Sequence, residues 1–396
     1  MAEALKRRIG LGLLTAYGVG VMVGAGIYVL VGAVAADAGI HAPWAFLLAG
    51  VIAAPTALSY AEFSTRIPEA AGEAAFVEKG FNLPLLGLIV GLAIVAAGTV
   101  SASAVLSGGV GYLMALVPIP AFAGVVILGV LLTTVAVVGV LESLALAAIF
   151  TAIELIGLAL VVWVGFSVEP SADFLAPQPF VLGGVAAAAV LAFFAFIGFE
   201  DIVNMAEEVE RPERNMPMAI LLSLVITTTI YALVSWATVR AVPLAELGQS
   251  RQPLALVWQA GRGGEAQFLS AIAVFAALNG VLAQIVMASR VMFGLGRKHK
   301  ALGMFTTTHP KRGTPVLATV LIGALVIIGA MALPLATLAE ATSTILLTVF
   351  VVVNASLIAL KRRTPEAPFQ VPMAVPVFGL VAAGAALVAN LGGVGA

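Results

Sequence analysis

The sequence contains no cysteine, and only 10% of its 396 residues are charged. The absence of cysteine excludes disulfides, thiolate chemistry and cysteine-ligated metal sites. A soluble domain has about 25% charged residues, so the scarcity of charge argues against a soluble protein. The three histidines fall in loops or at the very start of an apolar segment, and few side chains remain from which an enzyme could build a catalytic group. We therefore expect no enzymatic activity, no cofactor and no metal ion.

Two further absences exclude a class of partner and a source of energy. The formal net charge is -1, which offers no basic surface for nucleic acid. No G-x-x-x-x-G-K-[ST] motif occurs, so the chain has no P-loop with which to bind a nucleotide. We expect neither nucleic-acid binding nor a pump driven by nucleotide hydrolysis.

Apolar residues are abundant: they make up 62% of the chain, and the mean hydropathy is +1.14. Crossing the hydrocarbon of a lipid bilayer takes about 20 predominantly apolar helical residues, and the sequence contains eleven such segments. These spans lie at 9–35, 40–61, 82–116, 119–139, 143–167, 180–208, 215–240, 265–297, 314–336, 338–360 and 370–393. The sequence predicts an all-α integral membrane protein with about eleven transmembrane helices.

Lysine and arginine indicate the orientation, because short cytoplasmic loops carry the excess of positive charge. With a cytoplasmic N-terminus only Arg240, Arg251 and Arg262 fall outside. Fifteen fall inside: Lys6, Arg7, Arg8, Arg66, Lys79, Arg211, Arg214, Arg297, Lys298, Lys300, Lys311, Arg312, Lys361, Arg362 and Arg363. A miscounted span would scatter this bias. We expect a multi-pass protein of the cell inner (plasma) membrane with its N-terminus in the cytoplasm.

Two spans carry residues that interrupt a helix. Span 1 has glycine at positions 18, 20, 24 and 26, and span 6 has Gly198 shortly before Glu200 and Asp201. Matching interruptions in the first spans of two five-span halves are typical of secondary transporters. The sequence therefore predicts one transmembrane domain, with repeat one at about 9–167, repeat two at about 180–360 and an extra helix at about 370–393.

An interrupted helix exposes amide N–H groups on one half and carbonyl groups on the other, and lipid tolerates them only where they face a cavity or a ligand. The N–H end suits a carboxylate, and the carbonyl end suits an ammonium group. An α-amino acid carries both groups. For span 1, close helix packing is the alternative, since Gly20 and Gly24 form a small-xxx-small spacing.

Both interrupted spans resemble a known family. The stretch GVGVMVGAGIYVLVG resembles the first-helix signature of the amino acid–polyamine–organocation permease superfamily. The stretch FFAFIGFEDIVNMAEEVERPERNMPMAI resembles the sixth-helix signature, particularly that of the cationic-amino-acid-transporter-like branch. The resemblance implies a five-plus-five inverted-repeat (LeuT-like) fold with broken helices 1 and 6, alternating access, and an amino-acid site near the bilayer midplane.

The resemblance also implies particular site residues. The family's carboxylate-binding amides match Val23, Gly24, Ala25 and Gly26. Its amine-binding carbonyls match Val21, Met22, Phe194 and Ile197, and the side chains beside the substrate match Phe196 and Phe199. Glu200 is a candidate for substrate contact or for capping the inner half-helix. The family often has Ser or Thr where this chain has Ala25, so one hydroxyl contact to a carboxylate is missing.

Glu154 lies at the centre of the fifth span, in FTAIELIGLAL. An ionisable group at mid-helix costs about 2.5–3.5 kcal/mol on insertion scales and is usually functional. The resemblance implies ion coupling here, because many proton-coupled relatives carry a lysine at the matching position. We interpret Glu154 as a proton-coupling group. Two alternatives are that it holds Na⁺ or a basic substrate group, and that it only bonds to a neighbouring helix.

We therefore expect a secondary active transporter of amino acids, coupled to protons. An amine or polyamine transporter or exchanger is the main alternative, favoured by Glu154, Glu200 and the missing hydroxyl at Ala25. An ion channel is a weaker one, because broken helices also build ion filters.

Overall fold

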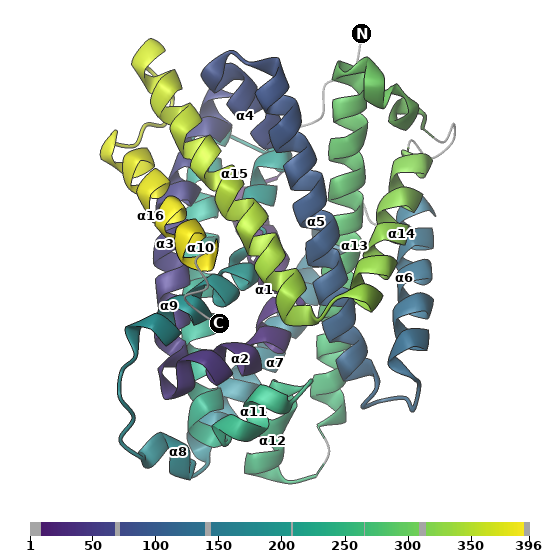
Figure 1. Ribbon diagram of the computed structural model, residues 1–396, viewed down its shortest axis with the longest axis vertical. Helices are drawn as coiled ribbons and strands as arrows, with labels where there is room; N and C mark the ends of the chain where they lie inside the picture. Colours follow the sequence, from purple (N-terminus) through teal and green to yellow (C-terminus); the bar gives the residue numbers. More distant parts are fainter. Residues whose placement is uncertain are drawn as a thin grey trace.

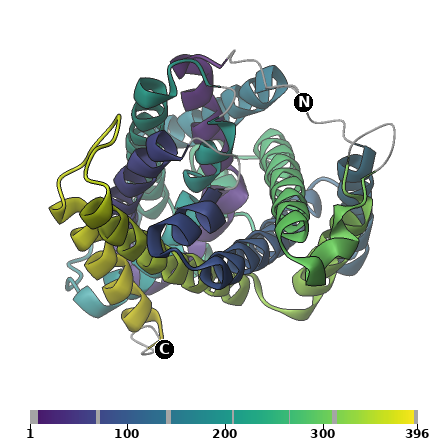
Figure 2. The same ribbon diagram turned by 90° about the horizontal axis from the view of Figure 1, so that it is seen from above.

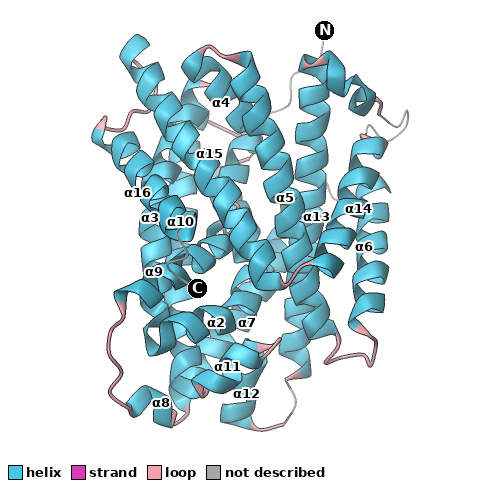
Figure 3. Ribbon diagram, viewed as in Figure 1, coloured by secondary structure: helices cyan, strands magenta, loops and turns pink. Residues whose placement is uncertain are grey.

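The computed structural model describes residues 9–67, 72–138, 144–206, 209–264, 266–308 and 314–391. Within these ranges the chain is helical apart from short connections (Figure 3). The described residues contain no β-sheet, only an isolated parallel bridge between Ile9 and Val209. The predicted all-α architecture is confirmed.

Each predicted span corresponds to helical structure in the described ranges. Spans 1 to 5 are α1 (Leu11–Val23) with α2 (Ala25–Ala38), α3 (Ala42–Arg66), α5 (Pro84–Leu113), α6 (Ala121–Val138) and α7 (Leu144–Ser167). Span 6 is α9 (Leu182–Phe193) followed by the 3₁₀ helices η2 (Phe194–Phe196) and η3 (Glu200–Met205). Spans 7 to 11 are α10 (Pro212–Ala241), α13 (Gln267–Lys298), α14 (Val316–Ala332), α15 (Leu335–Arg363) and α16 (Ala374–Leu391).

Helix boundaries follow local chemistry. α5, α10 and α12 (Pro253–Arg262) begin at proline, whose missing N–H costs nothing at the first helical position. α13 and α15 end in basic residues, which suit the negative end of the helix dipole. Both features are visible in the sequence, so the observed and predicted spans agree closely.

Short helices in the connections cover the two ends of the bundle and were not predicted. α4 (Gly72–Phe81) and η4 (Lys300–Thr306) lie towards the end where the N-terminus is drawn, and α8 (Ala172–Leu175), α11 (Leu244–Gln249) and α12 lie at the opposite end (Figure 1). η1 (Gly39–His41) joins α2 to α3. Helices of three to ten residues depend on tertiary packing, which no local pattern reports.

Basic residues separate between the two ends as predicted. At the α4 end, Lys298 Nζ lies 2.9 Å from Glu78 Oε2, and Lys361 Nζ and Arg66 both contact the buried carboxylate of Glu62. At the opposite end, Arg240 donates to the Gly165 carbonyl and the Arg262 guanidinium lies over the Trp163 ring. Lys6, Arg7, Arg8, Lys311 and Arg312 lie outside the described residues.

Large apolar side chains are exposed along the spans. Leu85, Phe122 and Ile156 are each at least 60% exposed, a pattern that lipid satisfies and water does not. Trp44 and Trp163 are also more than half exposed, near the ends of their helices, where membrane interfaces favour tryptophan. The surface is that of a multi-pass membrane protein.

The helix contacts of spans 1 to 5 are matched by equivalent contacts of spans 6 to 10. α3 packs against α10, α5 against α13 and α6 against α14, and each of these pairs joins equivalent spans. Span 1 packs against α10 through α1, and span 6 packs against α3 through α9. The extra helix α16, yellow in Figure 2, lies at the edge of the bundle against α15 and α3. These are the contacts that two five-span repeats would make, and the repeat boundaries stay a prediction.

The break in span 6 requires glycine at position 198. Gly198 has φ +127°, which L-residues rarely adopt. An added Cβ would lie 3.0 Å from the carbonyl carbon of Val21 and 3.1 Å from the amide nitrogen of Met22. The break of span 6 therefore packs directly on the main chain at the end of α1.

We predict that Gly198→Ala destabilises the protein by about 1–3 kcal/mol, because alanine meets both backbone strain and main-chain atoms. The measurement is thermal unfolding of the purified protein in detergent. Gly183→Ala, in α9, is the matched control, because an added Cβ there meets nothing within 4 Å. Equal melting temperatures for the two variants would contradict the contact described.

Candidate functional site

The two breaks face each other inside the bundle. Gly24, with φ -42° and ψ -165°, separates α1 from α2. A Cβ added to Gly26, in the first turn of α2, would lie 3.1 Å from Ala195 Cα in η2. Glycine at positions 26 and 198 thus allows the two main chains to approach. The predicted interruptions of spans 1 and 6 are confirmed, although span 1 loses only one residue of helix.

The start of α2 presents amide groups without a side-chain cap. Its N-cap residue is Gly24, and no side-chain hydrogen bond caps this end. The first amides of a helix have no intrahelical partner and form the positive end of its dipole. The predicted carboxylate-binding segment, which includes Val23, Gly24, Ala25 and Gly26, therefore spans the junction of the two half-helices.

A tyrosine from span 7 joins the two breaks. Tyr231 Oη, fully buried, lies 2.5 Å from the Met22 carbonyl oxygen and 2.8 Å from the Ala195 carbonyl oxygen. Phe46 and Phe196 pack edge-on against its ring. The predicted Met22 carbonyl lies at this junction. Sequence reasoning missed Tyr231 and Ala195, and the only signal was a tyrosine within an apolar span, whose hydroxyl needs a partner when buried.

The other predicted residues of span 6 divide between different surroundings. Phe194 faces the pocket described below, and its carbonyl oxygen accepts a hydrogen bond from the Ile197 amide at 3.2 Å. Phe196 packs against Tyr231, and Phe199 packs against Phe350 and Tyr60. The two predicted substrate-facing rings therefore belong to buried aromatic clusters in this conformation.

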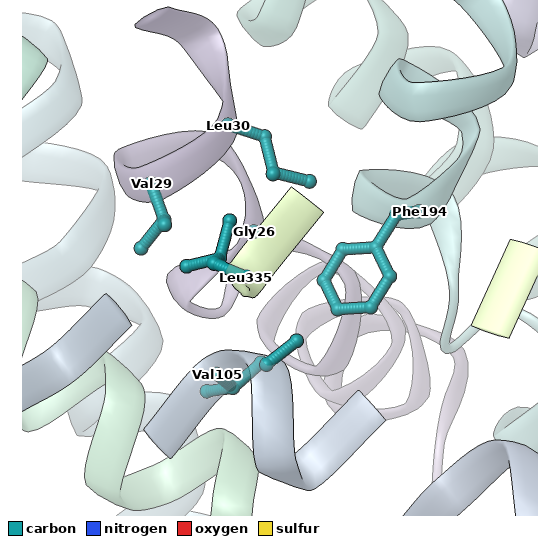
Figure 4. Close-up of a pocket in the computed structure, with 7 residues that line it drawn as sticks. Gly26, Val29, Leu30, Val105, Phe194 and Leu335 are labelled. Atoms are coloured by element: carbon teal, nitrogen blue, oxygen red, sulfur yellow. The ribbon is translucent and has the colours of Figure 1, made fainter. Parts of the chain in front are cut away.

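A small apolar pocket adjoins the breaks (Figure 4). The helices α2, α5, η2 and α15 contribute to its walls, and in this conformation the lining residues close together and leave no space for a water molecule. Its lining residues are Gly26, Val29, Leu30, Ala104, Val105, Phe194 and Leu335. In Figure 4 the Phe194 ring lies across the pocket from Val29. None of these seven described residues has a charged or polar side chain.

Glu200 and Asp201 are buried just after the break. The Gly198 amide donates to Glu200 Oε2 at 3.0 Å, so the Glu200 carboxylate bonds within the break, while the N-cap residue of η3, Phe199, makes no side-chain cap bond. Asp201 Oδ2 lies 3.5 Å from the side-chain nitrogen of Gln284 in α13. Neither acid lines the apolar pocket beside Gly26.

Glu154 is 1% exposed, and neither of its carboxylate oxygens has a hydrogen-bond partner among the described residues. Its main-chain carbonyl accepts a hydrogen bond from Tyr28 Oη in α2 at 2.9 Å. One turn earlier, Thr151 packs against Gly20 of α1. Glu154 therefore lies on a helix in direct contact with both halves of span 1.

Glu73 is a buried acid that the sequence analysis missed, because its loop segment shows no periodicity. It lies in α4, is 5% exposed, and is close enough to Asp201 and Tyr60 for their groups to affect its titration. Burial raises the pKa of Glu73 to about 7; the charge of Asp201 also raises it, whereas hydrogen bonding lowers it. Within the described part of the chain, no group of His, Asp and Glu side chains is arranged to hold a metal ion.

Comparison with known proteins identifies similar sequences over nearly the whole chain. The amino acid permease family model matches residues 9–394. The branched-chain amino acid permease BcaP of Bacillus subtilis (strain 168) is 29% identical over 403 aligned residues, covering 95% of this chain and 85% of that protein. The methylthioribose transporter of the same strain is 30% identical, covering 86% and 78%. Cationic amino acid transporter 4, vacuolar, of Arabidopsis thaliana is 29% identical, covering 81% and 57%.

We predict that Glu73→Gln changes how stability depends on pH. Because the pKa of Glu73 is raised from 4.5 to about 7 in the folded protein, the folded state retains a proton that the unfolded state loses between these values. The free energy of unfolding should fall by up to roughly 3 kcal/mol as pH rises through this window and then level off. Glu73→Gln should lack that fall.

The measurement is the melting temperature of each variant from pH 4.5 to 8. Glu78→Gln is the matched control, since Glu78 lies in the same helix but is partly exposed and paired with Lys298. If the difference between Glu73→Gln and the natural protein were constant with pH, Glu73 would not titrate in this window.

Proposed function

This chain belongs to the amino acid permease family, a family of transporters and not of enzymes, and we propose that its substrates are neutral α-amino acids with small aliphatic side chains. In this proposal the substrate binds between the breaks of spans 1 and 6, and transport proceeds by alternating access in the cell inner (plasma) membrane. The distribution of basic residues supports a cytoplasmic N-terminus.

The observation that carries the proposal is the wholly apolar lining of the pocket next to the start of α2, which is closed in this conformation and would open around a substrate side chain. An amino acid whose carboxylate is bound by the amides near Gly26 would have its side chain against Val29, Val105 and Phe194. A cationic side chain would enter this pocket without an acidic partner, and burying an unpaired charge is costly. The lining therefore favours leucine, valine or alanine over lysine or arginine.

The same lining separates this proposal from the polyamine alternative. A polyamine has no carboxylate for the amides of α2 and carries several charges that need acidic partners. Glu200 is engaged by the Gly198 amide, and neither Glu200 nor Glu154 lines the pocket. The similarity to a branched-chain amino acid permease is in keeping with an aliphatic substrate.

Alternating access and proton coupling are supported by different observations. Span 1 packs against span 7 as span 6 packs against span 2. In transporters built from two such repeats, alternating access is largely a rocking of one part of the helix bundle against the other. Glu154 supplies a buried carboxyl group on a helix that contacts span 1. We propose that this carboxyl group binds and releases the coupled proton as span 1 moves.

We predict that leucine and valine stabilise the purified protein in detergent, whereas lysine, arginine and spermidine do not, because a ligand that binds the folded state raises its melting temperature. Val105→Ala should then shift preference towards larger side chains by tenfold or more, the effect of about one methylene in an apolar pocket. Val90→Ala, about 22 Å away along the same helix, is the matched control. Stabilisation by amines alone would exclude the amino-acid proposal.

We predict that Glu154→Gln retains exchange of external for internal substrate but loses accumulation driven by a pH gradient. Glutamine keeps the shape of the side chain and cannot release a proton. The measurement is uptake of radiolabelled substrate into proteoliposomes, with Glu169→Gln, an exposed acid just after the same helix, as control. Equal loss of exchange and accumulation would assign Glu154 to binding or folding instead of coupling.

A further inference from the structure

The contact between Tyr231 and the two breaks has an unusual balance of donors and acceptors. Two carbonyl oxygens, of Met22 and Ala195, lie 2.5 Å and 2.8 Å from one hydroxyl. A hydroxyl carries a single proton, so it donates to one carbonyl at a time. Met22 lies in the last turn of α1, where carbonyls have no intrahelical partner. The Tyr231 hydroxyl oxygen and the two carbonyl oxygens therefore share a single donated proton.

This arrangement is complementary to an ammonium group. An ammonium group has three N–H donors and no acceptor, and the carbonyl end of a helix carries partial negative charge. The first amides of α2, one residue beyond the end of α1, lie where a carboxylate would be held under the proposed function. Acceptors for an ammonium group and donors for a carboxylate therefore lie on either side of Gly24.

We propose that Tyr231 is a positioning residue whose hydroxyl holds the Met22 and Ala195 carbonyls when no substrate is bound and is displaced from them by the substrate ammonium group. This inference rests on the proposed function. The hydroxyl competes with the ammonium group for the same acceptors, so it lowers substrate affinity and keeps the two breaks together before binding. Phe46 and Phe196 hold the ring edge-on, which fixes the hydroxyl at the junction.

A second buried tyrosine shows what a purely structural bond of this kind looks like. Tyr112 Oη donates to the carbonyl oxygen of Tyr28 at 2.6 Å, and both side chains are fully buried. That bond joins α5 to α2 through a single carbonyl. Replacing Tyr112 or Tyr231 by phenylalanine removes one donated hydrogen bond from a buried side chain in each case. Of these two tyrosines, Tyr231 is the one whose hydroxyl lies between two carbonyls that belong to the two breaks.

The test compares Tyr231→Phe with Tyr112→Phe in the full chain, by calorimetric titration in detergent with leucine and with 4-methylpentanoate, which lacks the amino group. Tyr231→Phe leaves the two carbonyls without their donor until an ammonium group arrives. Its leucine affinity should rise about tenfold, equivalent to 1.4 kcal/mol. Affinity for 4-methylpentanoate should not rise, and Tyr112→Phe should change neither.

A second measurement does not depend on the phenylalanine variant folding. 3-Fluorotyrosine placed at position 231 reports the surroundings of the hydroxyl through its fluorine resonance. Leucine should shift this resonance and 4-methylpentanoate should not. Unchanged or weaker leucine binding by folded Tyr231→Phe, or a fluorine resonance that leucine leaves unmoved, would overturn the inference while leaving the proposed function intact. Failure of the natural protein to bind any amino acid would overturn both.

Discussion

Two helices end inside this membrane protein, and the surrounding structure depends on how the main-chain groups at those ends are satisfied. Tyr231 supplies the contact, since its hydroxyl reaches the carbonyl of Met22 in span 1 and that of Ala195 in span 6. Such contact requires the two main chains to approach, which glycine at 26 and 198 permits. Unpaired backbone groups in hydrocarbon cost several kcal/mol each, so the two breaks stabilise one another.

The hydrogen-bond partners of the buried acidic side chains differ with their depth in the helix bundle. At the end of the bundle, Glu62 accepts bonds from Arg66, Lys361 and the Val371 amide, which ties α3, α15 and the chain leading to α16 together. Nearer the breaks, Glu200 is held by the Gly198 amide. Glu154 has no such partner among the described residues. Structural acids here are paired with basic or amide groups, and the unpaired carboxyl group is the one to which we assign coupling.

In the site that we propose, selectivity comes from the separation of polar and apolar groups around the breaks. Main-chain amides and carbonyls provide the polar groups, and these recognise what all α-amino acids share. Side chains from α2, α5, η2 and α15 provide the apolar pocket, which recognises how amino acids differ. A site of this kind can change its substrate by replacing pocket residues such as Val105 without disturbing the breaks.

The sequence by itself determined the spans and the positions of the two breaks, because apolar length and helix-breaking glycine act locally; the orientation is a prediction from the basic residues. The local pattern alone thus locates Gly198 and the end of span 1. Only the tertiary structure decided which groups meet there. Tyr231 and Met22 are 209 positions apart, Glu73 becomes buried through packing of a short helix, and the pocket is built from four separate spans. Such contacts leave no periodic signal in the chain, since each residue is compatible with ordinary packing until its distant partners are known.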